Sequence, residues 1–477
     1  MKKIINRLTA KNILMLVISF VCMFFLTTAS PFYAFNKSVD ANTMYTVGKG
    51  LLHGLLPYKD LFDNRGPLIY LIHSANAIFS YNSFTFIYVI ESLLLFLLAF
   101  TSRIFYYGDL PEEYAMTFVL ILLYSCIKYN WFDMPRRYYI VNGCFVAILF
   151  WIKYSLVIPW VIFFIYVGLA CLFTKRFKKL FVIILDALIG FLSVTLPIII
   201  LYWATGALKF LFNDYFYLNL THYHVQNASF AYTLFKMEYP TFGFSHHLVI
   251  IRTVYYLMIA IFICSVVRYM REAKMHDSNK ILLVLIVFID IIATYEVGGA
   301  SFSYYLFACE PFIIFYLFEL GLLVDKYLYN KKYLIWALSV IALLGIFVTN
   351  RNYRTSLHYL KPSESYQYEY SKIINKSKDK SLLNYRFLDV GLYTYTGTHA
   401  DNRFFIRNNI TYKPMYDAQR DYLHSLKYKF VVTKYRKGWR LWKVDTRFLK
   451  KHYIRLRHMR FNYQDHSEGW IDLYVRK

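Results

Sequence analysis

Acidic residues are scarce in this chain. Asp and Glu account for 29 of its 477 residues against 54 Lys and Arg, and charged residues together make up 17% of the sequence, whereas apolar ones make up 58%. A soluble domain of this length carries more charge and exposes less apolar surface, so this composition excludes an ordinary soluble enzyme. It predicts a polytopic all-α membrane bundle.

Cysteine is also rare, and common cofactor motifs are missing. The six cysteines all lie in apolar segments, and residues 351–477 contain none, which argues against a disulfide framework or a thiolate metal cluster. The sequence has no phosphate-binding P-loop, no dinucleotide-binding glycine fingerprint and no zinc-type His pair on a helix. A reaction that consumes a nucleotide through one of these loops is therefore not expected.

Long apolar runs are plentiful. A membrane-spanning helix needs roughly 20 apolar residues, and about eleven segments approach that length. The segments 67–80 and 139–152 are short enough to be re-entrant or tilted pieces instead. The predicted spans are 12–33, 67–80, 84–106, 113–128, 139–152, 155–173, 180–203, 248–268, 280–297, 305–323 and 333–349.

Lys and Arg predict the orientation of these spans. They gather before the first span and in alternate short loops, at 1–7, 128–137, 175–179, 268–280 and 325–332. Because cytoplasmic loops retain positive charge, this pattern predicts a cytoplasmic N-terminus and an external C-terminus. The basic start and first apolar run would also suit a signal peptide, but the run is long and lacks a small-x-small cleavage site, which favours an uncleaved span.

Residues 351–477 differ from the rest and predict a second domain. They carry 27 Lys or Arg against 11 Asp or Glu, a net +16 of the chain's +25. Alternating apolar residues predict strands at 429–433, 453–457 and 470–475, and helices are expected at 366–375 and 416–426. We therefore expect a membrane domain over 1–350 and a small, basic, extracytoplasmic α/β domain over 351–477. Its charge suits anionic headgroups or polymers, and no nucleic-acid motif accompanies it.

The loop after the first span concentrates charge between two apolar segments. It contains Asp40, Lys59, Asp60, Asp63 and Arg65. Asp40 suits either the N-cap of a helix over 41–52 or a general base. The other four suit either a salt-bridged loop or an acid and cation cluster around a phosphate leaving group. We expect an extended run after Pro57, whose period of two would place Lys59, Asp63 and Arg65 on one face.

The order of these residues carries a resemblance. An external Asp40, an amphipathic helix, the run from Gly54 to Asp63 (Gly-Leu-Leu-Pro-Tyr-Lys-Asp-Leu-Phe-Asp) and a Gly66-Pro67 entry to the next apolar segment resemble the first external loop of the GT-C superfamily of membrane glycosyltransferases. The bacterial branch similar to protein mannosyltransferases and aminoarabinose transferases is the nearest in pattern.

That resemblance implies an enzyme of the cell membrane with its active site on the extracytoplasmic face. It would move a sugar from a polyprenyl-phosphate carrier to a hydroxyl of a cell-wall polymer, glycolipid or protein. Asp40 matches the catalytic acidic position, and Asp60 and Asp63 match the second acidic cluster. Relatives commonly have Asp-Glu where this chain has Asp40-Ala41, so a divalent metal stays an open possibility.

Further residues are candidates for binding the donor. Lys153 and Arg252, at the outer ends of spans, suit a phosphate, although either side chain could instead snorkel to the interface. Tyr304 and Tyr305 suit a sugar or an interfacial aromatic belt. The substrate-binding candidates are Lys59, Arg65, Lys153, Arg252, Tyr304 and Tyr305.

Two other classes of protein share this composition. A lipid or polysaccharide transporter or flippase would also have many spans, but repeated halves with matching broken helices are expected there, and the sequence has none. A polymer-binding membrane protein could rely on the basic domain alone. The concentration of acids in one loop favours the enzyme, and this interpretation requires Asp40 to lie with the other charged residues of that loop and with Lys153.

Overall fold

A computed structural model describes residues 10–94, 107–129, 134–222, 365–436, 443–462 and 468–477, with single positions between 311 and 344. The predicted spans at 248–268, 280–297, 305–323 and 333–349 lie outside the described residues, apart from those single positions. Arg252, Tyr304 and Tyr305 lie outside them as well.

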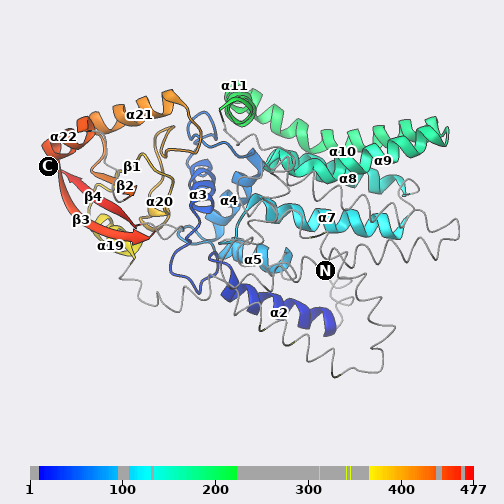
Figure 1. The fold of residues 1–477 in the computed structure, drawn as a ribbon, viewed down its shortest axis with the longest axis horizontal. Helices are drawn as coiled ribbons and strands as arrows, with labels where there is room; N and C mark the ends of the chain where they lie inside the picture. The colour runs from blue at the N-terminus through cyan, green and yellow to red at the C-terminus, as the bar shows by residue number, and fades with distance from the viewer. Residues whose placement is uncertain are drawn as a thin grey trace.

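Six apolar helices form the body of the described chain and run roughly along its long axis (Figure 1). Their positions agree with the predicted spans over the described residues, because long apolar runs fold as helices wherever backbone groups must be satisfied internally. The helices are α2 (Ala10–Leu26), α5 (Thr85–Leu94), α7 (Pro111–Lys128), α8 (Arg136–Ile152), α9 (Ile158–Phe173) and α10 (Phe177–Ala204).

Two stretches of helix among the described residues are long and apolar enough to cross a membrane. They are Tyr154–Phe173, which joins the 3₁₀ turn η2 (Tyr154–Val157) to α9, and Phe177–Ala204. Large apolar side chains stand outward on both, such as Phe173 and Trp203, which are 84% and 71% exposed. Such exposure is typical of a surface that lipid covers. The described part of the chain is thus mostly helical, with lipid-compatible faces.

Helices α8 and α10 approach each other through glycine. A Cβ on Gly143 would lie 2.0 Å from the Ala187 carbonyl oxygen, and one on Gly190 would lie 1.9 Å from that of Ile140. The same pair buries Asp186, which accepts two hydrogen bonds from Arg136. A carboxylate within an apolar helix is costly unless it is paired, so this ion pair offsets the cost.

Two shorter helices, α3 (Val39–Leu51) and α4 (Pro67–Phe79), lie across one end of the apolar helices (Figure 1). They run antiparallel and side by side, because Gly48 of α3 packs directly on α4 and the Tyr45 hydroxyl donates to the Ser80 carbonyl just after α4. The segment 67–80 therefore packs along α3 instead of standing among the long helices. The 13-residue length of α4 is short for a span of about 20 residues.

The N-cap of α3 is Ser38, not Asp40. The Ser38 hydroxyl accepts a hydrogen bond from the Ala41 amide, and Asp40 lies within the first turn. A carboxylate there is favourable toward the helix dipole, but it is not required for capping, so the side chain is available for another role.

The C-terminal residues form a four-stranded sheet with helices beside it. The strand order is β1-β2-β4-β3, in which β1 and β2 are parallel and the other pairs antiparallel. The three predicted strands and both predicted helices are present, whereas β1, α20 and α22 escaped prediction because they are short or polar. The elements are α19 (Tyr366–Asn375), β1 (Leu382–Tyr385), α20 (Leu392–Tyr395), α21 (Lys413–His424), β2 (Phe430–Arg436), α22 (Lys443–His452), β3 (Tyr453–Asn462) and β4 (Glu468–Arg476).

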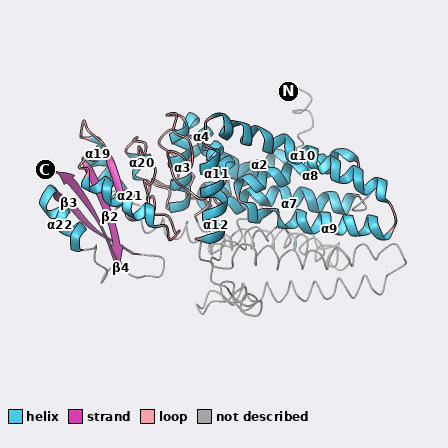
Figure 2. Ribbon diagram, turned by 90° about the horizontal axis from the view of Figure 1, so that it is seen from above, coloured by secondary structure: helices cyan, strands magenta, loops and turns pink. Residues whose placement is uncertain are grey.

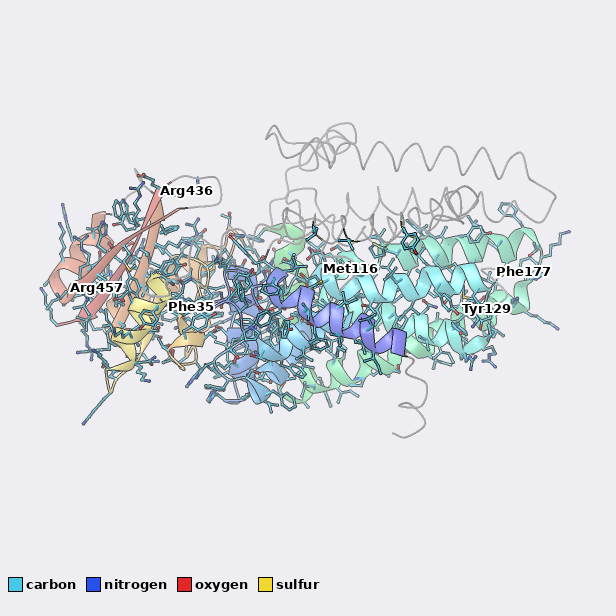
Figure 3. All side chains as sticks on the ribbon, turned by 90° about the horizontal axis from the view of Figure 1, so that it is seen from below. Phe35, Met116, Tyr129, Phe177, Arg436 and Arg457 are labelled. Atoms are coloured by element: carbon cyan, nitrogen blue, oxygen red, sulfur yellow. The ribbon has the colours of Figure 1, made fainter. Side chains whose placement is uncertain are left out.

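The sheet lies beyond α3 and α4, at one end of an elongated molecule (Figure 2). Tyr129 and Phe177, in or next to two of the basic loops, lie at the opposite end of the helices from Arg457 of the sheet (Figure 3). The first loop and the C-terminal domain therefore lie at one end of the described helices, and Tyr129 and Phe177 lie at the other.

Candidate active site

Three charged side chains of the first loop form a continuous chain. Arg65 Nη2 lies 2.6 Å from Asp40 Oδ1, and Arg65 Nη1 lies 3.0 and 2.9 Å from the two carboxylate oxygens of Asp63. The first turn of α3 supplies Asp40, and the segment leading into α4 supplies the other two. Burial alone would lower the pKa of Arg65, but the charges of Asp63 and Asp40 raise it well above its ordinary value. Arg65 therefore stays a cation between two carboxylates.

Asp63 is the anchored end of this chain. Its side chain is fully buried and, besides Arg65, receives hydrogen bonds from the Tyr70 hydroxyl (3.0 Å) and Asn408 Nδ2 (2.9 Å). Carboxylate oxygens accept hydrogen bonds, and these three donors together fix the position of the group. With its oxygens occupied in this way, Asp63 positions Arg65 and has little capacity left to bind a substrate.

Asp40 is the accessible end. Its side chain is 17% exposed, and Arg65 is its ion-pair partner among the described residues. That contact uses Oδ1, and within the described ranges Oδ2 is left for an incoming donor. Arg65 thereby orients a carboxylate that retains an acceptor site, which is the arrangement that a general base requires.

The segment after Pro57 is a tight turn, so the predicted extended run is wrong. Tyr58 adopts φ +70°, its amide donates to the Leu61 carbonyl (2.7 Å), and the Leu56 amide donates to Asp60 Oδ2 (2.9 Å). Asp60 thus closes the turn. Lys59 is exposed and donates to the Thr205 carbonyl at 3.3 Å, away from the face that period-two spacing predicts.

Lys153 pairs with an acid at the start of α7. Its Nζ lies 2.6 Å from Glu112 Oε1, in the first turn of α7. The backbone connects this pair to the loop, because the Gly66 amide donates to the Ile152 carbonyl (2.9 Å) and a Cβ on Gly66 would lie 2.0 Å from the Trp151 carbonyl oxygen. Lys153 and Arg65 therefore flank one backbone contact.

The C-terminal domain supplies residues that the sequence did not indicate. Asn408 reaches Asp63, and Arg403 makes two hydrogen bonds to Asp214, at 3.0 and 2.8 Å. Arg403 Nε also donates to the Tyr58 carbonyl (2.8 Å). Asp214 lies in the π-helix η3 (Phe212–Tyr217) and is fully buried. Burial raises its pKa, and Arg403 acts in the opposite direction.

A second acidic group lies behind α4. Asp109 accepts from the Tyr114 hydroxyl (3.2 Å), and its amide donates to Glu91 (2.7 Å) and Glu113 (3.2 Å). His73 Nε2 of α4 lies 3.4 Å from Asp109 Oδ1. All five side chains are buried. Glu91 and Glu113 are 22 residues apart in the sequence, and only the fold brings them together.

A divalent metal does not fit between the acids of the first loop. Arg65 occupies the position between Asp40 and Asp63 where a bridging cation would bind. Over the described ranges, no group of three or more His, Cys, Asp or Glu side chains could hold a metal ion.

Comparison with known proteins gives a distant likeness. No protein-family model and no curated protein matches the chain. Its fold is similar to the crystal structure of an oligosaccharyltransferase from Archaeoglobus fulgidus, determined with zinc and sulfate, at a TM-score of 0.47 and 12% identity over 96% of this chain and 72% of that one.

Proposed function

We propose that this chain is a membrane glycosyltransferase that moves a sugar from a polyprenyl-phosphate carrier to a hydroxyl group on the extracytoplasmic face. The observation that supports it most directly is the pair of salt bridges by which Arg65 links Asp63 to Asp40. These bridges end in a carboxylate, that of Asp40, which is oriented by a partly buried cation, keeps an acceptor oxygen that no described residue occupies and lies at one end of a bundle of apolar helices.

In the proposed reaction Asp40 is the catalytic base. The acceptor hydroxyl donates its proton to Asp40 Oδ2 as its oxygen attacks the anomeric carbon of the sugar. The bond from that carbon to the carrier's phosphate oxygen breaks, and the electron pair leaves with the phosphate. Because the leaving group is already activated, the protein needs a positioned base and cations but no nucleotide.

The remaining candidates keep narrower roles. Lys153 is the cation best placed for the departing phosphate, because it neighbours the Gly66 contact and is 25% exposed beside Glu112. Lys59 is exposed near the end of α10 and would meet a phosphate only at the rim of the site. Arg252, Tyr304 and Tyr305 stay predicted donor contacts. Asp63 positions Arg65, and Asp60 closes its turn. No step is assigned to a metal.

The test uses Asp40→Asn in purified full-length protein or in membranes. This change removes the base while preserving the shape of the side chain, so we expect transfer from a labelled polyprenyl-phosphate sugar to fall by roughly 10²- to 10⁴-fold, the contribution typical of a general base. Expression and thermal midpoint should stay within error of wild type.

Asp60→Asn is the matched control. An Asn side-chain oxygen still accepts the Leu56 amide, so this variant should keep most of its activity. A panel of carrier-linked sugars with wall polymer, glycolipid and protein acceptors would identify the substrates. Undiminished transfer by Asp40→Asn would refute the proposal, whereas movement of the intact carrier lipid by wild type, with no glycosidic product, would establish the transporter alternative.

A further inference from the structure

One side chain of the C-terminal domain reaches the interior of the first loop. Asn408 is buried and donates through Nδ2 to Asp63 Oδ1 (2.9 Å) and to Asn64 Oδ1 (3.1 Å). Its own Oδ1 accepts a hydrogen bond from the Asn409 backbone amide (2.6 Å). The backbone amide of Asn408 donates to Met415 Sδ (3.3 Å). Every polar atom of the Asn408 side chain therefore has a partner, and its orientation is determined on both sides.

The hydrogen bond from Asn408 to Asp63 is linked to the proposed base, Asp40, through Arg65. Asp63 shares its two oxygens among Arg65, Tyr70 and Asn408. Arg65 in turn holds Asp40 through its other terminal nitrogen. The donor from Asn408 fixes the orientation of the Asp63 carboxylate, and the two oxygens of that carboxylate hold Arg65 in place. The position of Asp40 thus depends on the side-chain amide of Asn408, which is 345 residues from Asp63 in the sequence.

We infer that the C-terminal domain is a working part of the active site, with Asn408 as a positioning residue that holds Asp63, and through it Arg65, for the base Asp40. This inference rests on the proposed function for its catalytic readout. It assigns to the domain a role beyond covering or anchoring the membrane part.

Docking of the domain does not depend on Asn408. Arg403 bonds both Asp214 and the Tyr58 carbonyl, and the Phe62 amide donates to the Arg403 carbonyl (2.7 Å). Thr46 of α3 donates to Asp389 (2.6 Å) at a separate contact. Removing the side-chain amide of Asn408 therefore leaves these contacts in place. The effect of that removal on Asp63 can then be measured separately from the docking of the domain.

The experiment compares Asn408→Ala, Asn408→Asp and the exposed neighbour variant Asn409→Ala in the full chain. Asn408→Ala should lower kcat by roughly 10- to 100-fold, the range of one hydrogen bond to a charged group, and change KM for the carrier-linked sugar by less than about twofold, because Asn408 does not touch substrate. Asn409→Ala should behave as wild type. Arg403→Ala, which weakens docking, should lower the thermal midpoint, whereas Asn408→Ala should change it much less.

Asn408→Asp provides a signature that a structural role alone would not give. It places a second carboxylate against Asp63, and two such groups cannot both be ionised at low cost. This variant should be nearly inactive at pH 7 and recover part of its rate as the pH falls and one of the two carboxyls takes up a proton. Wild type has no second carboxyl at this position and should show no such recovery.

A readout without catalysis separates this inference from the proposed function. Phenylglyoxal modification of Arg65, followed by peptide mass spectrometry, should be at least about threefold faster in Asn408→Ala than in wild type and unchanged in Asn409→Ala. Unchanged modification, or wild-type kcat and pH profile in Asn408→Ala, would overturn the positioning role. Active Asp40→Asn protein with faster Arg65 modification in Asn408→Ala would overturn the proposed base but retain the structural link.

Discussion

Arg65 is the side chain on which both carboxylates of the site depend. Its Nη1 is hydrogen-bonded to both oxygens of Asp63 while its Nη2 lies beside Asp40, and only a planar guanidinium presents donors in that geometry. Arg65→Lys keeps the charge but cannot reach both acids, so we expect transfer to fall by roughly 10- to 100-fold. Measured kcat at saturating donor tests this expectation.

Arg65→Gln is the companion variant. It removes the cation and leaves Asp63 as an uncompensated charge in a buried position, which typically costs about 3–5 kcal/mol. Its thermal midpoint should therefore fall well below that of Arg65→Lys. Equal midpoints for the two variants would show that the charge of Arg65 does not stabilise Asp63.

At the residue scale, the sequence indicates the site residues of the first loop but not those of the C-terminal domain. Asp40, Asp63 and Arg65 lie in one short loop, so their unusual charge density is visible along the chain, and the structure brings all three together. Asn408 and Arg403 are ordinary polar residues of a basic domain, and nothing local marks them. Their contacts to Asp63 and Asp214 exist only because the fold joins segments 345 and 189 residues apart.

At the scale of elements, apolar runs and polar turns differ in how well they can be predicted. The helix over 41–52 and the segments that became α7 to α10 follow their apolar patterns. The run after Pro57 was wrong, since alternation over so few residues cannot reveal that Asp60 accepts the Leu56 amide and that Tyr58 takes a positive φ. The charges on this turn consequently have different partners, since Lys59 donates to the Thr205 carbonyl and Arg65 pairs with Asp40 and Asp63.

The contact between α3 and α4 positions the ends of these helices and hence Asp40 against Arg65. A Cβ on Gly48 would lie 2.6 Å from His73 Cβ and 2.7 Å from the Tyr70 carbonyl oxygen. Gly48→Ala must therefore separate the helices, and we expect a loss of about 1–3 kcal/mol in stability, the usual cost of overpacking, with lower transfer activity. Thermal unfolding in detergent and an activity assay would measure both.

Gly168→Ala is the control for that substitution. Gly168 is also helical, in α9, but a Cβ there meets no atom of the described residues within 4 Å. Ala is favoured over Gly inside a helix by up to about 1 kcal/mol, so this variant should match wild type or exceed it slightly in stability. A Gly48→Ala protein as stable and active as Gly168→Ala would contradict the importance of the α3–α4 contact.

At the scale of the whole molecule, a buried polar contact joins α3 to the C-terminal domain. Asp389 accepts from the Thr46 hydroxyl (2.6 Å) and the Gly391 amide (2.8 Å). Lys49 is also buried, donates to the Tyr393 carbonyl (3.3 Å) and lies 4.0 Å from the centre of the Tyr81 ring. Burial raises the pKa of Asp389 from 3.8 to about 6, and burial lowers that of Lys49 from 10.5 to about 8 against the opposing charge of Asp389.

These two shifts make the stability of the docked domain depend on pH in a defined direction. Since the folded state holds a proton on Asp389 up to about pH 6, its contribution is complete below about pH 4 and is lost as the pH rises through 6, a change of about 3 kcal/mol. Lys49 contributes the opposite slope above about pH 8. The side chain introduced by Asp389→Asn cannot titrate. The thermal midpoint of wild type should therefore fall relative to that of this variant between pH 4 and pH 7. Comparing both proteins at each pH cancels the titration of groups that do not interact with Asp389, and a constant difference between pH 4 and pH 7 would show that Asp389 is not buried at this contact.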